Sequence, residues 1–260
     1  MSQFFRSVWV IAYREFLRFL QDRPRMISSF AMPLLFLVIF GAGFGKLIGQ
    51  AAPGVDYIQF MYPGILAMTV LFTSIMSGVS IVWDREFGFL KEVLVSPLSR
   101  SGVLVGKAVG AATIAVIQGI IMLVLAPFLN ISINLGTVLA LLPLLLLLSL
   151  ALSGLGLLIG ARMRSQQGFQ ILMQLVIFPM MFLSGIFYPI SGVATWLEVL
   201  SKLNPVTYGI DAIRQVFLGT DVAAITIFGH TMSIVESALV VAAVGVALLS
   251  AAIWVFNRQE

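Results

Sequence analysis

The sequence WDREFGFLKEVLVSP, residues 83–97, places five charged side chains between two long apolar runs. A run of about 20 apolar residues is long enough for a helix to cross the roughly 30 Å hydrocarbon core of a bilayer. We therefore interpret the charged segment as a connection that leaves the membrane between two spanning helices.

The composition of the whole chain supports this interpretation. The 260 residues are 60% hydrophobic and 10% charged, and the mean hydropathy is +1.07. Soluble domains are about 45–50% apolar and about 25% charged. The chain is therefore predicted to be an integral membrane protein with one transmembrane domain over residues 1–260.

Apolar runs without any charged residue or histidine predict the number of spans. Each is long enough to cross a bilayer as a helix. The expected fold is an all-α integral membrane protein with six transmembrane helices. The six runs cover residues 26–45, 58–83, 108–129, 135–161, 165–189 and 237–256.

The distribution of Lys and Arg predicts the orientation of these spans. If the N-terminus is cytoplasmic, 12 of the 15 basic residues fall in cytoplasmic segments. Short cytoplasmic loops of membrane proteins carry such an excess. We expect a multi-pass protein of the plasma (cytoplasmic or inner) membrane with both termini in the cytoplasm. Because orientation explains the basic residues, no nucleic-acid partner is expected.

Residues 1–25 are predicted to form a cytoplasmic amphipathic helix before the first span. At about 100° per residue, one side of this helix is apolar and the opposite side carries two arginines and an aspartate. We expect the helix to lie among the inner headgroups, with the arginines toward anionic lipid or a partner protein. The apolar side comprises Phe5, Trp9, Ala12, Phe16 and Leu20, and the charged side comprises Arg14, Arg18 and Asp22.

The opening segment itself has the pattern of a short amphipathic helix over 84–97. Phe87, Leu90 and Leu94 share one face, charged residues lie on the other, and Pro97 ends the helix. A loop lying on lipid is the alternative. Mixed-sign charge suits lipid binding less well than an all-basic face would, so docking to a protein is favoured.

The last connection, residues 190–236, is expected on the outer side with short helices of its own. An Asn-Pro turn at 204–205 begins a helix that ends at Gly219, and Trp196 marks a second helix before it. A purely structural cap and a substrate gate both fit this segment.

Two glycine-lysine motifs do not have the spacing of a phosphate loop. GAGFGK, residues 41–46, and GVLVGK, residues 102–107, have three residues between the glycines where a phosphate loop has four. The glycines of GLGLLIG, residues 154–160, lie within a span and indicate close helix packing. With no cysteine and a single histidine, His230, no catalytic residue, metal site or bound cofactor is expected.

The spans contain no ionisable residue well inside them, which argues against a carrier driven by protons. They do carry phenylalanine, methionine and a few uncharged polar groups, which suit an apolar or amphipathic cargo. The candidate cargo path comprises Phe36, Phe40, Phe72, Thr73, Met76, Gln174 and Phe182.

Several motifs resemble one known family. The segment DREFGFLKEVLVSPLSR, residues 84–100, followed by GK at 106–107, is similar to a signature of the ABC-2 type permeases. These are membrane subunits of ATP-binding-cassette exporters, including the daunorubicin-resistance and nodulation-factor export permeases. Further matches are REFLRFLQDR at 14–23, FLSGIFYPI at 182–190 and LSKLNPVTYGIDAIRQVFLG at 200–219.

The resemblance implies roles for the two amphipathic segments. Residues 84–97 would form a coupling helix in a groove of a separate ATPase subunit, with the N-terminal helix as an interface helix beside it. The implied ATPase-coupling residues are Arg85, Glu86, Phe87, Gly88, Lys91, Glu92 and Pro97, and those of the interface helix are Arg14, Glu15, Arg18 and Asp22.

The resemblance also implies an assembly of two permease chains, identical or different, with two ATPase chains that hold ATP and magnesium. The expected function is a permease subunit that exports a hydrophobic or amphipathic cargo, drug or lipid-like. A stand-alone secondary carrier or channel is the alternative, and a scaffold or sensory subunit without transport is a third reading.

Overall fold

The computed structural model describes residues 2–51, 57–88, 98–129, 131–190, 193–219, 225–227 and 229–258. Within these ranges the chain is almost entirely helical, and six helical segments are long and apolar enough to cross a membrane. The described strands form one short antiparallel hairpin. The all-α membrane fold expected from the sequence is confirmed.

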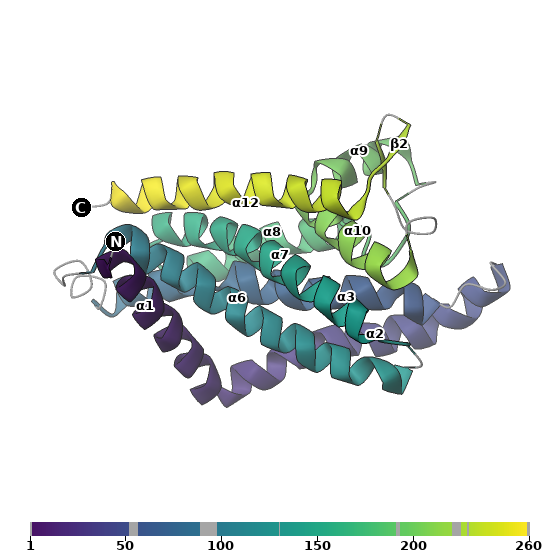
Figure 1. Cartoon of the computed structure of the whole chain (residues 1–260), viewed down its shortest axis with the longest axis horizontal. Coiled ribbons are helices and arrows are strands. Elements are labelled where there is room, and N and C mark those ends of the chain that lie inside the picture. The colour runs from purple at the N-terminus through teal and green to yellow at the C-terminus, as the bar shows by residue number, and fades with distance from the viewer. Residues whose placement is uncertain are drawn as a thin grey trace.

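The spans run lengthwise in one elongated bundle (Figure 1). The second span is made of two helices separated by a turn at Ser77 and Gly78. In chain order the elements are α1 (Ser2–Gln21), α2 (Arg23–Ala51), α3 (Tyr57–Met76), α4 (Val79–Glu86), α6 (Arg100–Leu125), η1 (Ala126–Leu129), α7 (Leu135–Arg162), α8 (Gln166–Leu183), α9 (Thr195–Leu203), α10 (Pro205–Leu218), β1 (Thr226–Ile227), β2 (His230–Thr231) and α12 (Ile234–Asn257).

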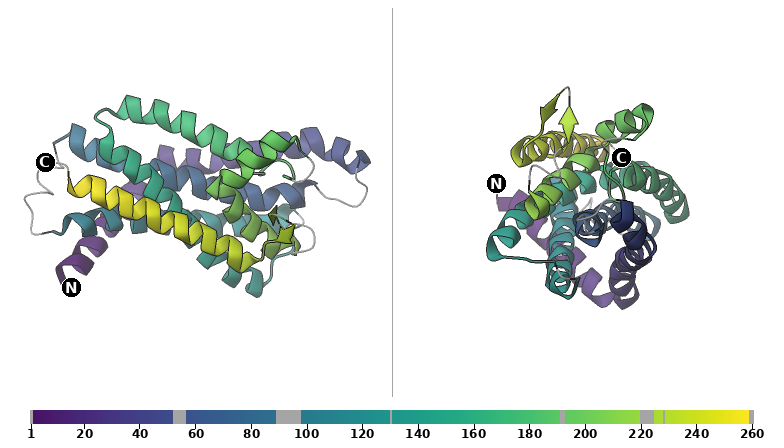
Figure 2. Two further views of the ribbon diagram at one scale, coloured as in Figure 1. Left: turned by 90° about the horizontal axis from the view of Figure 1, so that it is seen from above. Right: turned by 90° about the vertical axis from the view of Figure 1, so that its right-hand side faces the viewer.

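Both ends of the described chain lie at the same end of the bundle (Figures 1 and 2). The end of α4 and the start of α6 lie there too, and α1 crosses this end obliquely before the chain turns into α2. This arrangement follows from an even number of spans. It brings the two amphipathic segments of the sequence to one end of the molecule.

The centre of the bundle is α3, which is buried along most of its length. Apolar side chains such as Met61, Ile65 and Leu71 are fully enclosed by the surrounding helices. In contrast, α2 and α8 each leave an apolar face exposed, with Val38 and Ile39 on α2 and Ile171 and Leu175 on α8.

Side-chain caps set where several spans begin. The Ser99 hydroxyl accepts a hydrogen bond from Gly102 N, and Asn134 Oδ1 accepts one from Thr137 N. Ser233 and Glu236 form a capping box at the start of α12. Each cap satisfies a backbone N–H group that has no partner within its helix.

The turn between α3 and α4 sits against glycines of α7. A methyl group at Gly78 would overlap the backbone of Gly156, and one at Gly160 would overlap the backbone of Gly78. Such close approach of two backbones requires residues without side chains. The packing role expected for the glycines of 154–160 therefore fits the structure, and α4 starts from a tight crossing point.

A second stripe of glycines holds α1 against α6. A Cβ at Gly106 would lie 2.8 Å from Ile11 Cβ, and one at Gly110 would lie 2.9 Å from Glu15 Cβ. The spacing of four residues, beginning at Gly102, places these glycines on one helix face. The amphipathic helix α1 is therefore packed into the bundle at this end, as well as presenting Trp9 outward.

The connection before α12 contains the two short helices expected there, α9 and α10. Asn204 joins them: Oδ1 accepts from Val206 N at 3.1 Å and Nδ2 donates to Met180 O at 2.7 Å. Gly219 follows α10 with φ +84°, a conformation that favours glycine.

Two charged residues of α10, Asp211 and Arg214, are buried rather than exposed. Arg214 donates to Gly185 O at 2.7 Å and lies over the Phe60 ring. Burial raises the pKa of Asp211 and lowers that of Arg214 to about 10. This segment is therefore anchored in the end of the bundle opposite the two termini, and a role as a substrate gate stays a prediction.

Candidate coupling site

Three helices meet in a buried charge cluster at the end of the bundle that carries α1. Asp84, at the end of α4, is only 4% exposed. Its Oδ1 accepts from Arg14 Nη2 of α1 at 2.7 Å, and its Oδ2 accepts from Lys107 Nζ of α6 at 2.6 Å. One carboxylate therefore links all three helices.

Lys107 completes the cluster from the other side. It is 1% exposed, and its ammonium also donates to Glu15 Oε1 at 3.1 Å and to Ser80 Oγ at 2.9 Å. An ammonium has three protons, and here each has an acceptor. Two cations and two carboxylates balance one another, which is the condition under which charges are tolerated out of water.

The cluster links the helices that precede and follow segment 89–97. Asp84 lies on α4, before this segment in the chain, and Lys107 lies on α6, after it. Their ion pair therefore connects α4 to α6. Arg14 and Glu15 fasten both to α1. Movement of the segment would therefore be transmitted to three helices together.

Arg85, expected to contact an ATPase, holds α4 to α7 in this structure. Its guanidinium donates to Ala161 O at 2.7 Å and also to Met163 O. These carbonyls lie at the end of α7, where backbone acceptors lack intrahelical partners. Arg85 therefore positions α4, and its contact with a partner stays a prediction.

The helix expected over 84–97 differs from the described geometry at its start. Residues 84–86 are the last turn of α4, and Gly88 has φ +78°, a left-handed conformation that ends a helix. Glu86, Phe87 and Gly88 are exposed at this point. The predicted coupling residues Lys91, Glu92 and Pro97 lie outside the described residues.

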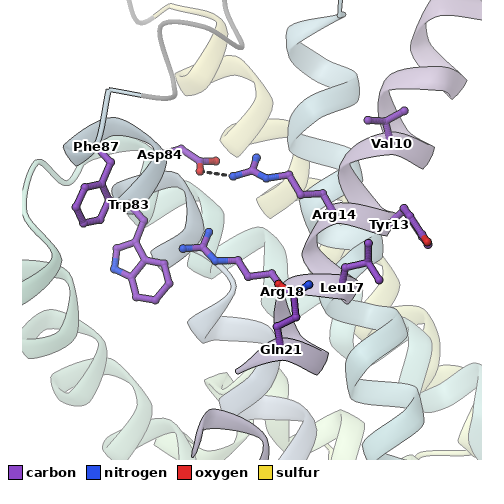
Figure 3. A pocket seen from close by; sticks show the side chains of 9 residues that line it. All are labelled: Val10, Tyr13, Arg14, Leu17, Arg18, Gln21, Trp83, Asp84 and Phe87. Atoms are coloured by element: carbon purple, nitrogen blue, oxygen red, sulfur yellow. Dashed lines mark hydrogen bonds and ion pairs between the residues drawn. The ribbon is translucent and has the colours of Figure 1, made fainter. Parts of the chain in front are cut away.

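Two arginines of α1, Arg14 and Arg18, extend toward α4, a neighbour that the sequence did not predict. Arg14 extends toward Asp84, and the Arg18 guanidinium lies 4.2 Å from the centre of the Trp83 ring (Figure 3). Asp22 sits at the junction, where its N–H donates to Arg18 O at 3.1 Å. Helical periodicity identified the charged face, but not the neighbour that it faces.

A groove of about 600 Å³ lies between α1 and the end of α4 (Figure 3). The two guanidinium groups cross it, and the exposed Phe87 ring stands at α4's side of it. Its lining residues are Val10, Tyr13, Arg14, Leu17, Arg18, Gln21, Trp83, Asp84 and Phe87.

Three residues of the candidate cargo path line a second cavity, of about 240 Å³, between α1, α2 and α3. These are Phe72, Thr73 and Met76. Beside it, Gln118 of α6 bridges two of the lining helices, because its amide donates to Ser29 Oγ at 2.8 Å and its carbonyl accepts from the Thr73 hydroxyl. The other lining residues are Phe19, Ser28, Ser29, Met32 and Pro33.

Three further residues of that path form an aromatic cluster around Phe187. The ring of Phe187 lies 5.6 Å from Phe36, 4.8 Å from Phe40 and 5.5 Å from Phe182 between centroids. The sequence motif 182–190 contained Phe187, but its role as the centre of the cluster was missed. Gln174 lies exposed on α8, apart from both groups.

The charge cluster itself was also missed by sequence reasoning. Lys107 was counted as a basic residue of a cytoplasmic loop, and Asp84 as the first residue of the coupling segment. One signal was present: Lys107 directly precedes the charge-free run 108–129, which places it at the start of a span and not in the middle of a loop.

The fold and this site define a multi-pass membrane protein whose amphipathic segments converge on one end. A family model described as ABC-2 type transporter matches residues 6–218. The chain therefore belongs to the ABC-2 type transporter family, a family of transport permeases, and membership implies association with an ABC ATPase subunit.

Named relatives carry permease and transport descriptions. A putative transport permease, ycf38, from Cyanophora paradoxa is 31% identical over 82% of this chain and 75% of its own length. A probable multidrug ABC transporter permease, YbhR, from Escherichia coli strain K12 is 31% identical over 64% of this chain and 45% of its own. Nodulation protein J from Rhizobium leguminosarum bv. viciae is 28% identical over 76% of each.

Proposed function

We propose that this permease is the membrane subunit of an exporter that moves a hydrophobic or amphipathic cargo, drug or lipid-like, out of the cytoplasm. ATP would be hydrolysed on a separate ABC ATPase subunit, which would also hold magnesium. The observation that carries the proposal is the Asp84 cluster, which joins α1, α4 and α6 at both ends of segment 89–97.

ATP binding would be coupled to movement of the bundle through the contact between the docked segment and the ATPase groove, which would differ between two states. Nucleotide on the ATPase can shift the bundle only as far as the docked segment binds its groove differently in two states. Because Asp84 and Arg85 fasten α4 to α1, α6 and α7, a pull on the segment moves α4 together with its neighbours. The glycine crossing at Gly78 then serves as the pivot.

The two groups of cargo-path residues support an apolar route along α2. The cavity at Met32 and Pro33 lies one turn from Phe36, and Phe40 follows one turn later. A volume of about 240 Å³ is below the roughly 300–1,000 Å³ of small-molecule pockets. Cargo would therefore require the cavity to open, or a second chain to complete it.

A second permease copy, identical or different, is part of the proposal. The apolar faces of α2 and α8 are exposed over several turns, which is the pattern expected where a membrane helix meets another chain or lipid. The remaining lipid-facing surface would contact the bilayer. We place the protein in the plasma membrane with both termini in the cytoplasm. This orientation rests on the excess of Lys and Arg in the segments on the side of the termini.

A stand-alone secondary carrier is the competing function. A carrier driven by protons needs an ionisable group that exchanges its proton during transport. The buried carboxylate at Asp84 has a cation on each oxygen, an arrangement that suits a structural link better than a carrier site. The exporter is therefore favoured.

The test is nucleotide-driven activity of the complex in lipid nanodiscs with a candidate ATPase. Glu86→Ala and Phe87→Ala alter exposed residues at the start of the coupling segment 84–97, while Phe128→Ala alters an exposed residue on η1 as a matched control. A panel of drugs and lipids should stimulate ATP hydrolysis in the native complex and in the control, but not in the two variants. If no ATPase associates with the chain, the stand-alone carrier becomes the better account.

A further inference from the structure

The groove between α1 and α4 carries an excess positive charge. Its charged lining residues are Arg14, Arg18 and Asp84. Arg14 is engaged by Asp84, whereas Arg18, among the described residues, stacks on Trp83 and forms no ion pair. A half-buried guanidinium in this position can donate two parallel hydrogen bonds to an anion.

Apart from Gln21, the rest of the groove is apolar or aromatic and opens beside an exposed apolar surface. Val10, Tyr13 and Leu17 project from α1 on the groove side, and all three are exposed. Tyr13 stacks with the exposed Trp9, one turn earlier. Tyrosine and tryptophan with an apolar body and a polar edge are typical of the membrane surface, where headgroups and acyl chains meet.

We infer that this groove binds the headgroup of an anionic phospholipid. The phosphate contacts Arg18, the headgroup extends past Tyr13 and Val10 toward the end of the bundle, and the upper acyl chain lies along Leu17 toward α2. Charge complementarity selects the ligand, because the groove has one net positive charge and the headgroup of an anionic phospholipid has one net negative charge, whereas a zwitterionic headgroup has none. The inference requires only that the chain span a membrane, so it does not depend on the exporter proposal.

A phospholipid fits the surface better than an acidic protein segment. An acidic side chain would satisfy Arg18 but leave the apolar residues beside it in water. A lipid covers both, because its charge and its hydrocarbon are joined in one molecule. Bound here, the lipid would join α1 to Trp83 and Phe87, at the start of the coupling segment.

The test uses the purified full-length chain and native mass spectrometry, with phosphatidylglycerol or phosphatidylcholine added. Arg18→Gln removes the proposed contact, and Arg6→Gln removes the same charge from an exposed position of α1 that does not line the groove. Native chain should retain phosphatidylglycerol over phosphatidylcholine. Arg18→Gln should weaken its binding about tenfold, the loss of one charge-assisted contact, and Arg6→Gln should leave it unchanged.

A second variant guards against a folding defect. Arg18→Lys keeps the charge but not the planar fork, and should restore part of the lipid binding. Equal binding of the two lipids by the native chain overturns the inference, as does equal loss in Arg18→Gln and Arg6→Gln. If Arg18→Gln instead releases a co-purified ATPase without changing lipid binding, the groove takes a protein and the inference is wrong.

Discussion

Lys107 Nζ lies 2.6 Å from Asp84 Oδ2, 23 residues away in the chain. The pair links α4, which precedes segment 89–97 in the chain, to α6, which follows it. A buried ion pair of this kind adds little stability compared with apolar residues, but removing one partner is costly. Its value is therefore in fixing the relative position of α4 and α6.

Lys107→Met should lower the free energy of unfolding by about 3–5 kcal/mol, because Asp84 and Glu15 lose a buried cation. Lys202→Met is the control, since Lys202 pairs with Glu198 at the surface and its loss should cost no more than about 1 kcal/mol. Thermal unfolding in detergent measures both. Lys107→Met with Asp84→Leu should recover part of the loss; no recovery would contradict a paired role.

Gly106→Leu should displace α1 from α6, because a side chain at this position meets Ile11 Cβ at 2.8 Å. The chain has no cysteine, so Ile11→Cys provides a single thiol at a buried site. Its maleimide labelling should be slow alone and several-fold faster with Gly106→Leu. Gly43→Leu, where a side chain would have open space, should not change the rate; equal rates in all three would contradict the packing.

Thr73→Val should impair cargo-stimulated ATP hydrolysis, because it removes the hydrogen bond to the buried Gln118 carbonyl beside the cavity. The lost bond should cost about 1–3 kcal/mol, since a buried acceptor is left without its donor. Thr113→Val is the control, because its exposed hydroxyl bonds only within its own helix, to Val109 O. If cargo stimulates ATP hydrolysis normally in Thr73→Val, this cavity is not part of the cargo path.

Asp211→Asn should remove a pH dependence of stability. Burial raises the pKa of Asp211, so the folded state holds the proton more tightly than the unfolded chain. The contribution of this group is therefore largest below its unfolded pKa and falls as the pH rises through its folded pKa. The melting temperature of the native chain relative to Asp211→Asn should decline with rising pH in the acid range; a rising difference would contradict the sign.

Single cysteines should report the orientation in the membrane. Phe87→Cys and Phe128→Cys place exposed thiols on α4's end and on η1, with native exposures of 78% and 82%. With the expected cytoplasmic termini, an impermeant maleimide should label the first only in inside-out vesicles and the second only in right-side-out vesicles. The reverse pattern would invert the proposed topology.

The sequence alone determined the class of fold and much of its local structure. Charge-free runs of membrane length predicted six spans because an unpaired charge or backbone group is costly in hydrocarbon. The Asn-Pro turn and Gly219 predicted α10, because capping and left-handed glycine are local effects. The motif around residues 84–100 indicated the family, which the family match confirms.

Only the tertiary structure decided which side chains meet. Periodicity placed Arg14 and Arg18 on the charged face of α1, but their partners come from α4, about 65–70 residues further along the chain. Lys107 gave no sign in composition of its burial, and Phe187 none of its place among three other rings. Such contacts depend on how the helices cross, and here that is set by glycines that let α1 approach α6 and the α3–α4 turn approach α7.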